Sequence, residues 1–145
     1  MIVVVDPGVA LKWFVEEPLR LQARSLLVHR HDLVAPDILI AGVAELARQK
    51  TLAGEIAPDQ ALPIVRNIAL PAFISTFVDS ARLRHRALAI ALHCGRPVSD
   101  GLYAACAEEI AAPLVSTDEP FLQALAAGGI PIRGIPLARI HELAG

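Results

Sequence analysis

Several features that mark specialised classes of protein are scarce in this sequence. Its 145 residues include two cysteines, two lysines, one tryptophan and one tyrosine. No apolar run approaches the ~20 residues of a membrane-spanning helix, and no basic segment precedes the apolar start, so we expect neither a membrane span nor a signal peptide. Cys94 and Cys106 each fall in an apolar helical pattern, which favours buried thiols over a disulfide or a metal pair. We therefore expect a cytoplasmic protein.

The overall charge and aromatic content do not indicate a nucleic-acid-binding protein, and the two local arginine clusters, Arg20–His31 and Arg82–Arg86, are interpreted as solvated helix faces, the alternative being phosphate binding. The net charge is −2, and only 4% of the residues are aromatic. Trp13 and Phe14 are accordingly interpreted as core or dimer residues, and Lys12 and Arg96 as solvated charges rather than phosphate contacts.

Apolar residues are abundant, at 54% of the chain with a mean hydropathy of +0.52. We expect one domain with a large core and an apolar surface that meets a partner, and hence an oligomer.

Short apolar runs alternate with helical patterns along the chain. The runs predict strands at Ile2–Val5, Asp32–Ala35, Phe73–Phe77, Leu114–Ser116 and Ile130–Ile132. Periodicity and end signals predict helices at Val9–Glu16, Leu19–Arg30, Ile38–Lys50 (capped by Asp37), Asp59–Ala69, Ser80–His93, Gly101–Ile110 and Phe121–Ala127. This alternation predicts an α/β fold of three layers, with a central, mostly parallel sheet flanked by helices.

Three aspartates stand at equivalent places in this pattern. Asp6 ends the first strand, Asp100 opens a helix, and Asp118 follows the strand Leu114–Ser116. Taken singly, Asp100 and Asp118 suit helix caps. In a doubly wound sheet, however, these places converge on one crevice, where three carboxylates repel one another unless a cation lies between them. A hard divalent cation such as Mg²⁺ fits, which favours metal-assisted phosphodiester hydrolysis.

Four segments in register resemble PIN-domain proteins, and most closely the VapC-type toxins of bacterial toxin–antitoxin pairs. The segments are Val3–Phe14, Ala35–Ala41, Ser99–Ala107 and Pro113–Asp118. The resemblance covers nearly the whole chain and implies a single PIN-like domain over residues 1–145.

The resemblance also implies a function and a site. The function is that of an endoribonuclease toxin dependent on Mg²⁺ or Mn²⁺, which hydrolyses RNA, forms a homodimer and is neutralised by a cognate VapB-type antitoxin. Asp6 and Asp100 become the principal metal ligands, and Asp118 the further acid.

Two positions depart from the family pattern. Gly8 stands where the family usually has a small hydroxyl residue, and Gly42 stands where it usually has a glutamate. The nearest acid is Glu45, one turn later. Because helical side chains lean towards the N-terminus, Glu45 is a candidate catalytic residue that reaches back over Gly42, the alternative being an exposed helix residue.

Other functions remain to be weighed against the nuclease. A PIN-fold module with weakened catalysis, which acts mainly by binding its antitoxin or RNA, is the second hypothesis because of Gly8 and Gly42. A phosphoacceptor receiver domain needs a lysine late in the chain, whereas the lysines are Lys12 and Lys50. A phosphatase of the Asp-x-Asp type is excluded by Gly8.

Overall fold

The structure is a computed structural model and describes residues 1–29 and 31–144. Its centre is a five-stranded parallel sheet with the order β3-β2-β1-β4-β5. The strands are β1 (Ile2–Val5), β2 (Asp32–Pro36), β3 (Thr76–Val78), β4 (Leu114–Ser116) and β5 (Gly134–Pro136). The central strand β1 thus pairs with β2 on one side and with β4 on the other.

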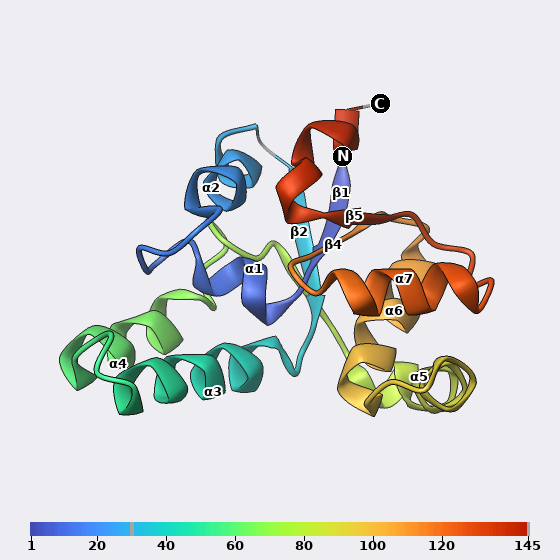
Figure 1. Cartoon of the computed structure of the whole chain (residues 1–145), viewed down its shortest axis with the longest axis horizontal. Helices are drawn as coiled ribbons and strands as arrows, with labels where there is room; N and C mark the ends of the chain where they lie inside the picture. Colours follow the sequence, from blue (N-terminus) through green and yellow to red (C-terminus); the bar gives the residue numbers. More distant parts are fainter. Residues whose placement is uncertain (30, 145) are drawn as a thin grey trace.

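Helices connect the strands and cover both faces of the sheet. They are α1 (Pro7–Leu11), α2 (Arg20–Val28), α3 (Leu39–Leu52), α4 (Pro58–Asn67), α5 (Ser80–Cys94), α6 (Val98–Ile110), α7 (Glu119–Ala127) and the 3₁₀ segment η1 (Leu137–Ala144). Figure 1 shows α1–α4 on one side of the sheet and α5–α7 on the other. The predicted three-layer α/β fold is confirmed.

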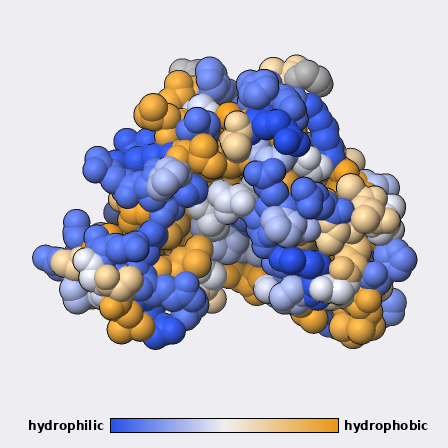
Figure 2. All heavy atoms as spheres, in the orientation of Figure 1, coloured by the Kyte–Doolittle hydropathy of each residue, from blue (hydrophilic) through white to orange (hydrophobic). Residues whose placement is uncertain are grey.

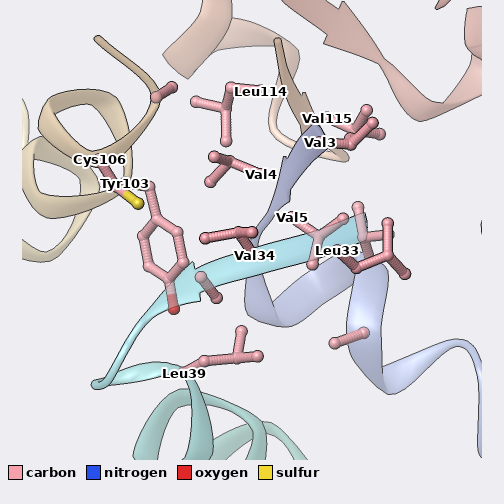
Figure 3. Close-up of a cluster of buried hydrophobic side chains, with 14 of the residues drawn as sticks. Val3, Val4, Val5, Leu33, Val34, Leu39, Tyr103, Cys106, Leu114 and Val115 are labelled. Carbon is pink, nitrogen blue, oxygen red and sulfur yellow. The ribbon is translucent and has the colours of Figure 1, made fainter. Parts of the chain in front are cut away.

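The core forms around β1, as its run of valines predicts. Val3, Val4 and Val5 are completely buried. Figure 3 shows them among side chains of β2, β4 and α6. A strand buried on both faces in this way is typical of an all-parallel sheet. The indole of Trp13 is also buried and donates from Nε1 to the carbonyl of Ala23, at 2.9 Å, which confirms its assignment to the core.

The strand order reverses at β1, which places a crevice at one end of the sheet. Connections that leave β1 towards β2 and β3 pass over one face, and those that reach β4 and β5 pass over the other, so the two helical layers diverge at the carboxyl ends of the strands. Figure 2 shows the surface hollowed between the two layers, along the lower edge of the view. This is the edge where the chain leaves β1 at Asp6.

The helix α6 lies close against α5 because it carries a glycine at the contact. A Cβ added to Gly101 would overlap the backbone carbonyl oxygen of Ala87 on α5. Only a residue without a side chain permits this approach. Since Asp100 precedes Gly101, the close packing of the two helices also fixes the position of Asp100.

Two local predictions were wrong. The last strand is Gly134–Pro136 rather than Ile130–Ile132, because its backbone pairs with β4 while Ile132 N–H turns back to the carbonyl of Ile130, at 2.8 Å. Asp37 does not cap α3, whose first residue follows Ile38. Its carboxylate instead accepts the backbone N–H of Ser80, at the start of α5.

Other predicted elements were correct in kind and differed in extent. The helix predicted at Val9–Glu16 is the shorter α1, the strand predicted at Phe73–Phe77 is the shorter β3, and α2 ends at Val28. The prediction for Arg30 lies outside the described residues. Both cysteines are free thiols, as expected.

Large apolar side chains are exposed on several helices. They include Leu21 and Val28 on α2, Leu62 on α4, and Leu88 and Leu92 on α5. This is the apolar surface that the composition indicates, and a partner that covers it stays a prediction. Within the described ranges, no helix combines the length and apolar character needed to cross a membrane.

Candidate functional site

A cavity of about 670 Å³ lies at the carboxyl ends of β1 and β4, between α3 and α6. The three predicted aspartates, Asp6, Asp100 and Asp118, all line it. Apolar side chains from α3, α6 and α7 and the N-cap of α3 also line it, among them Ile38, Leu46, Leu102 and Phe121, together with polar residues that include Glu45, Ser99 and Thr117. The structure therefore brings together three acids that are far apart in the sequence.

Asp6 is buried at the point where β1 passes into α1. Only 8% of the residue is exposed. Pro7 occupies the first turn of α1, and the Oδ1 atom of Asp6 accepts the backbone N–H of Val9, at 3.1 Å. Asp6 is therefore the N-cap of α1, and its carboxylate is fixed by the helix that follows it.

Ser116 links Asp6 to the next strand of the sheet. Its hydroxyl, which is completely buried at the end of β4, donates a short hydrogen bond to Oδ2 of Asp6. The same hydroxyl oxygen accepts the backbone N–H of Asp118, at 3.0 Å. Ser116 thus fixes the relative position of the chain ends of β1 and β4.

Arg96 joins the other two aspartates. Its Nη2 atom lies 2.7 Å from Oδ2 of Asp118 and 3.0 Å from Oδ2 of Asp100, and its Nε donates to Asp100 at 3.1 Å. The guanidinium carbon also lies 5.6 Å from the centre of the Phe121 ring. Arg96 is therefore a partly buried cation between two carboxylates, and the interpretation of this residue as a solvated charge was wrong.

The two aspartates that pair with Arg96 occupy different positions at the starts of their helices. Asp118 is the N-cap of α7 and accepts the N–H of Phe121 on Oδ1, at 3.0 Å. Asp100 lies within the first turn of α6, because α6 begins at Val98 and its N-cap is Pro97. The capping role considered for Asp118 is confirmed, whereas the carboxylate of Asp100 accepts from the side chain of Arg96 instead.

The carboxylates differ in how far water reaches them: Asp6 is buried, whereas the side chains of Asp100 and Asp118 are partly exposed. Burial raises the pKa of Asp6 to about 6, against the lowering effect of its hydrogen bonds from Ser116 and Val9, and the charges of Asp100 and Asp118 raise it further. Burial also raises the pKa of Asp100, although Arg96 opposes this. A site that disfavours its own negative charge favours a bound cation.

Comparison of sequences identifies the family. The model of the PIN domain family matches residues 3–125. The chain belongs to the PIN domain family. A search of curated proteins finds no match.

Solved PIN-like structures share the fold at low identity. PAE2754 from Pyrobaculum aerophilum superposes with a TM-score of 0.70 at 17% identity, over 99% of this chain and 98% of that one. VapBC2 from Rickettsia felis, bound to a DNA fragment from its promoter, gives 0.63 at 12% identity, over 94% and 98%. FitAcB from Neisseria gonorrhoeae gives 0.60 at 14% identity, over 94% and 98%. Each similarity is one of fold.

Gly42 has no room for a side chain. A Cβ at Gly42 would stand 2.6 Å from Cγ of Pro7. A Cβ at Gly8 would stand 2.5 Å from the hydroxyl oxygen of Thr117, an exposed side chain that can rotate away. The ring of Pro7 therefore fills the space next to Gly42, whereas a small side chain at Gly8 would require only a shift of Thr117.

Glu45 lies at the edge of the cavity with its carboxylate engaged elsewhere. The side chain is half exposed, and both carboxylate oxygens accept from Arg48, at 2.7–3.2 Å. This hydrogen bonding lowers the pKa of Glu45, so the carboxylate stays charged. The predicted reach over Gly42 is not the arrangement seen, and the catalytic role of Glu45 stays a prediction.

Sequence reasoning did not place three residues in the site: Ser116, Arg96 and Tyr103. The hydroxyl of Tyr103 is buried against the cavity without a hydrogen-bond partner among the described residues. A signal existed for each. Ser116 is a polar residue at the end of a buried strand, and Arg96 and Tyr103 stand four residues before and three after Asp100, on neighbouring turns of the chain.

The aspartates of the cavity offer oxygen ligands, which hard divalent cations such as Mg²⁺ prefer. Within residues 1–29 and 31–144, no group of three or more His, Cys, Asp or Glu side chains is arranged so that it could hold a metal ion. Mg²⁺ typically uses one or two carboxylates and keeps several waters. Asp6 and Asp100 line the same cavity and stay the predicted ligands of such an ion.

We predict that Asp6→Asn stabilises the metal-free protein at neutral pH. The pKa of Asp6 is about 6 in the folded state and 3.8 for an unperturbed aspartate, so the folded state binds the extra proton between these values. The free energy of unfolding of the wild type, measured relative to that of the variant, therefore falls by roughly 2.5 kcal/mol as the pH rises from about 4 to about 7. Urea titrations in EDTA measure this, and parallel pH curves would contradict it.

We also predict that Gly42→Ala lowers the free energy of unfolding by about 1–3 kcal/mol, because the ring of Pro7 cannot rotate away from the added methyl group. Pro7→Ala in the same chain removes the ring. The double variant is then expected to recover stability, since alanine also favours the helix. The two effects must be non-additive in denaturant unfolding. Additive losses would show that the contact is not the cause.

Proposed function

We propose that this PIN-domain protein is an endoribonuclease toxin of a toxin–antitoxin pair, dependent on Mg²⁺ or Mn²⁺. The observation that carries the proposal is the meeting of Asp6, Asp100 and Asp118 at one cavity at the carboxyl ends of β1 and β4. The PIN family match and the similarity of fold to VapBC2 and FitAcB support it.

The residues of the site have separable roles in the proposed reaction. When bound at Asp6 and Asp100, the cation would polarise the phosphate and lower the pKa of water. Val9 and Ser116 hold the Asp6 carboxylate in one orientation through their hydrogen bonds. Asp6 is the acid that is buried from bulk water, which strengthens the electrostatic interactions of its carboxylate.

Arg96 balances the charge of the site in the free protein. Its guanidinium contacts Asp100 and Asp118 at 2.7–3.1 Å. A cation that binds Asp100 competes with Arg96 for that carboxylate. Once Asp100 no longer holds it, Arg96 has a planar fork of donors suited to a phosphate group of RNA.

The partners of this protein are proposed from the same comparison. We expect a cognate VapB-type antitoxin and a homodimer, because solved structures of similar fold are VapBC and FitAB complexes and because exposed leucines lie on α4 and α5. The second candidate function is a binding module with weakened catalysis. It is favoured by Gly8 and Gly42, which carry no side chain, and a Cβ at Gly42 would stand 2.6 Å from Cγ of Pro7.

We predict that the protein cleaves RNA in the presence of Mg²⁺ or Mn²⁺ and that EDTA abolishes the cleavage. Asp6→Ala and Asp100→Ala each lower the rate by about a hundredfold or more, because each removes charge stabilisation at the reacting phosphate. Asp59→Ala, at an exposed position of α4, is the matched control and keeps the wild-type rate. Gel assays on a mixture of RNAs measure all of them.

The outcomes separate the two candidate functions. Cleavage by both aspartate variants at the wild-type rate would refute the site, and equal cleavage with EDTA would refute the role of the metal. Antitoxin binding without cleavage would favour the binding module. In the same assay, a loss in Glu45→Gln supports the predicted role of Glu45, and the wild-type rate removes it.

We predict that Arg96→Gln binds Mn²⁺ about threefold to tenfold more tightly than the wild type, since the competing cation is gone. Without metal, the variant melts at a lower temperature, because Asp100 and Asp118 lose their shared partner. Arg82→Gln, which breaks an exposed ion pair between Arg82 on α5 and Glu109 on α6, is the control. Electron paramagnetic resonance titration measures free Mn²⁺. Weaker binding by Arg96→Gln would contradict the competition.

A further inference from the structure

Thr117 stands between two residues whose side chains are bonded within the site. Ser116 donates to Asp6, and Asp118 pairs with Arg96. The backbone on both sides of Thr117 is fixed, because Ser116 ends β4 and Asp118 caps α7. The side chain of Thr117 itself is exposed and lines the cavity together with the three aspartates. Its hydroxyl is therefore a solvent-accessible polar group on a segment whose position the fold sets.

The hydroxyl of Thr117 occupies the space beside Gly8. A Cβ at Gly8 would stand 2.5 Å from Oγ1 of Thr117 and 3.6 Å from Oδ1 of Asp6. The same point is thus close to the threonine hydroxyl and to the buried carboxylate. This geometry places the hydroxyl on the Asp6 side of the cavity.

The backbone does not require glycine at position 8. Gly8 lies in the first turn of α1, after Pro7. Among the described residues, the glycines with positive φ are Gly54, Gly95 and Gly129. In the arrangement seen, it is the hydroxyl of Thr117 that keeps position 8 free of a side chain. The two positions share one space, so a small polar group can enter it from either side.

The site has few donors that are free to meet a phosphate. The aspartates are acceptors, the hydroxyl of Ser116 donates to Asp6, and Arg96 is bonded to two carboxylates. A phosphodiester brings oxygen acceptors, which need O–H or N–H donors. The hydroxyl of Thr117 can donate without changing the charge of the site. The cavity has another exposed hydroxyl, that of Ser99, but it belongs to the start of α6.

Thr117 also lies where an extended ligand would leave the cavity. Gly8 and Thr117 line both the acidic cavity and a neighbouring hollow of about 390 Å³. The hollow holds the ammonium groups of Lys12 and Lys50, which share the carboxylate of Glu17 at 3.0 and 2.6 Å. An ammonium group has three N–H donors, so these ion pairs leave donors for an anion. A polyanion that extends from the cavity into the hollow passes over Thr117.

We propose that the hydroxyl of Thr117 contacts the RNA substrate by donating a hydrogen bond to a non-bridging oxygen of the phosphate that is cleaved. This inference rests on the proposed nuclease function, which it deepens. Gly8 is the residue that leaves space for this hydroxyl beside Asp6.

The first test is Thr117→Val, which keeps the branched shape of the side chain and removes the hydroxyl. The expected result is a kcat/KM for RNA lowered by about tenfold, because a hydrogen bond to a charged group is lost. Thr117→Ser keeps the hydroxyl and is expected to stay within about twofold of the wild type. The Kd for Mn²⁺ is expected to be unchanged in both variants, since Thr117 is not a ligand of the proposed metal.

The second test moves the hydroxyl across the shared space. In Gly8→Ser with Thr117→Ala, the hydroxyl enters from α1, and kcat/KM is expected to recover to within about threefold of the wild type. Gly8→Ala with Thr117→Ala has the same backbone and no hydroxyl, and is expected to stay as low as Thr117→Val. Both pairs are expected to fold, because Thr117→Ala removes the atom that a Cβ at position 8 would meet and because serine and alanine favour a helix more than glycine does.

Thr76→Val is the matched control, since Thr76 is exposed at the start of β3 and does not line the cavity. It is expected to keep the wild-type kcat/KM. Wild-type kcat/KM in Thr117→Val would overturn the inference, and so would equal activity of the serine and alanine pairs. A loss of Mn²⁺ affinity in Thr117→Val would also overturn it, because the hydroxyl would then serve the metal. If Asp6→Ala cleaves normally, the proposed function itself fails.

A third measurement is independent of cleavage. Fluorescence anisotropy gives the Kd for a labelled single-stranded RNA with Ca²⁺ in place of Mg²⁺, and a gel shows that the RNA stays intact. Thr117→Val is expected to bind about threefold to tenfold more weakly than the wild type, and Thr117→Ser equally well. Equal affinity of the wild type and Thr117→Val would overturn the inference even for a protein that cleaves no RNA.

Discussion

The structure depends on one buried charge, the carboxylate of Asp6 at the end of the central strand. The valines of β1 require burial on both faces, and the chain must leave the sheet at the point where the strand order reverses. Asp6 occupies that point and is fixed by Val9 and Ser116, neither of which carries a positive charge. Burial therefore raises the pKa of Asp6. Because neither Val9 nor Ser116 supplies a positive charge, the site favours a bound cation.

The other site residues are arranged around this constraint. Asp118 is held by the start of α7 and Asp100 by the close contact of α6 with α5, so both are set by the packing of whole helices. Arg96 balances these two acids, and its ion pairs do not extend to Asp6. An aspartate that caps a helix can also serve the site. The hydrogen bonds that cap α1 and α7 orient the carboxylates of Asp6 and Asp118 at the cavity.

The sequence predicted what depends on local pattern and missed what depends on tertiary contact. The buried strand at Val3–Val5, the convergence of the three aspartates and the α/β layers follow from apolar runs and from the rules of parallel sheets. The last strand was misplaced because a run of three residues carries too little periodicity, and pairing with β4 decided its position. Arg96 was missed because it pairs with Asp118, 22 residues away, and Tyr103 because its hydroxyl has no protein partner among the described residues.

The departures at Gly8 and Gly42 are the basis of the second candidate function, and of the two only Gly42 is confined by a rigid neighbour, the ring of Pro7. If the site still works despite this change, Asp6 and Asp100 together bind a cation. Anomalous diffraction from crystals soaked in Mn²⁺ tests this most directly. We predict a single peak in contact with the carboxylates of Asp6 and Asp100, with the guanidinium of Arg96 no longer bonded to Asp100. A saturated crystal with no peak at Asp6, and with Arg96 still between Asp100 and Asp118, would contradict the proposed metal site.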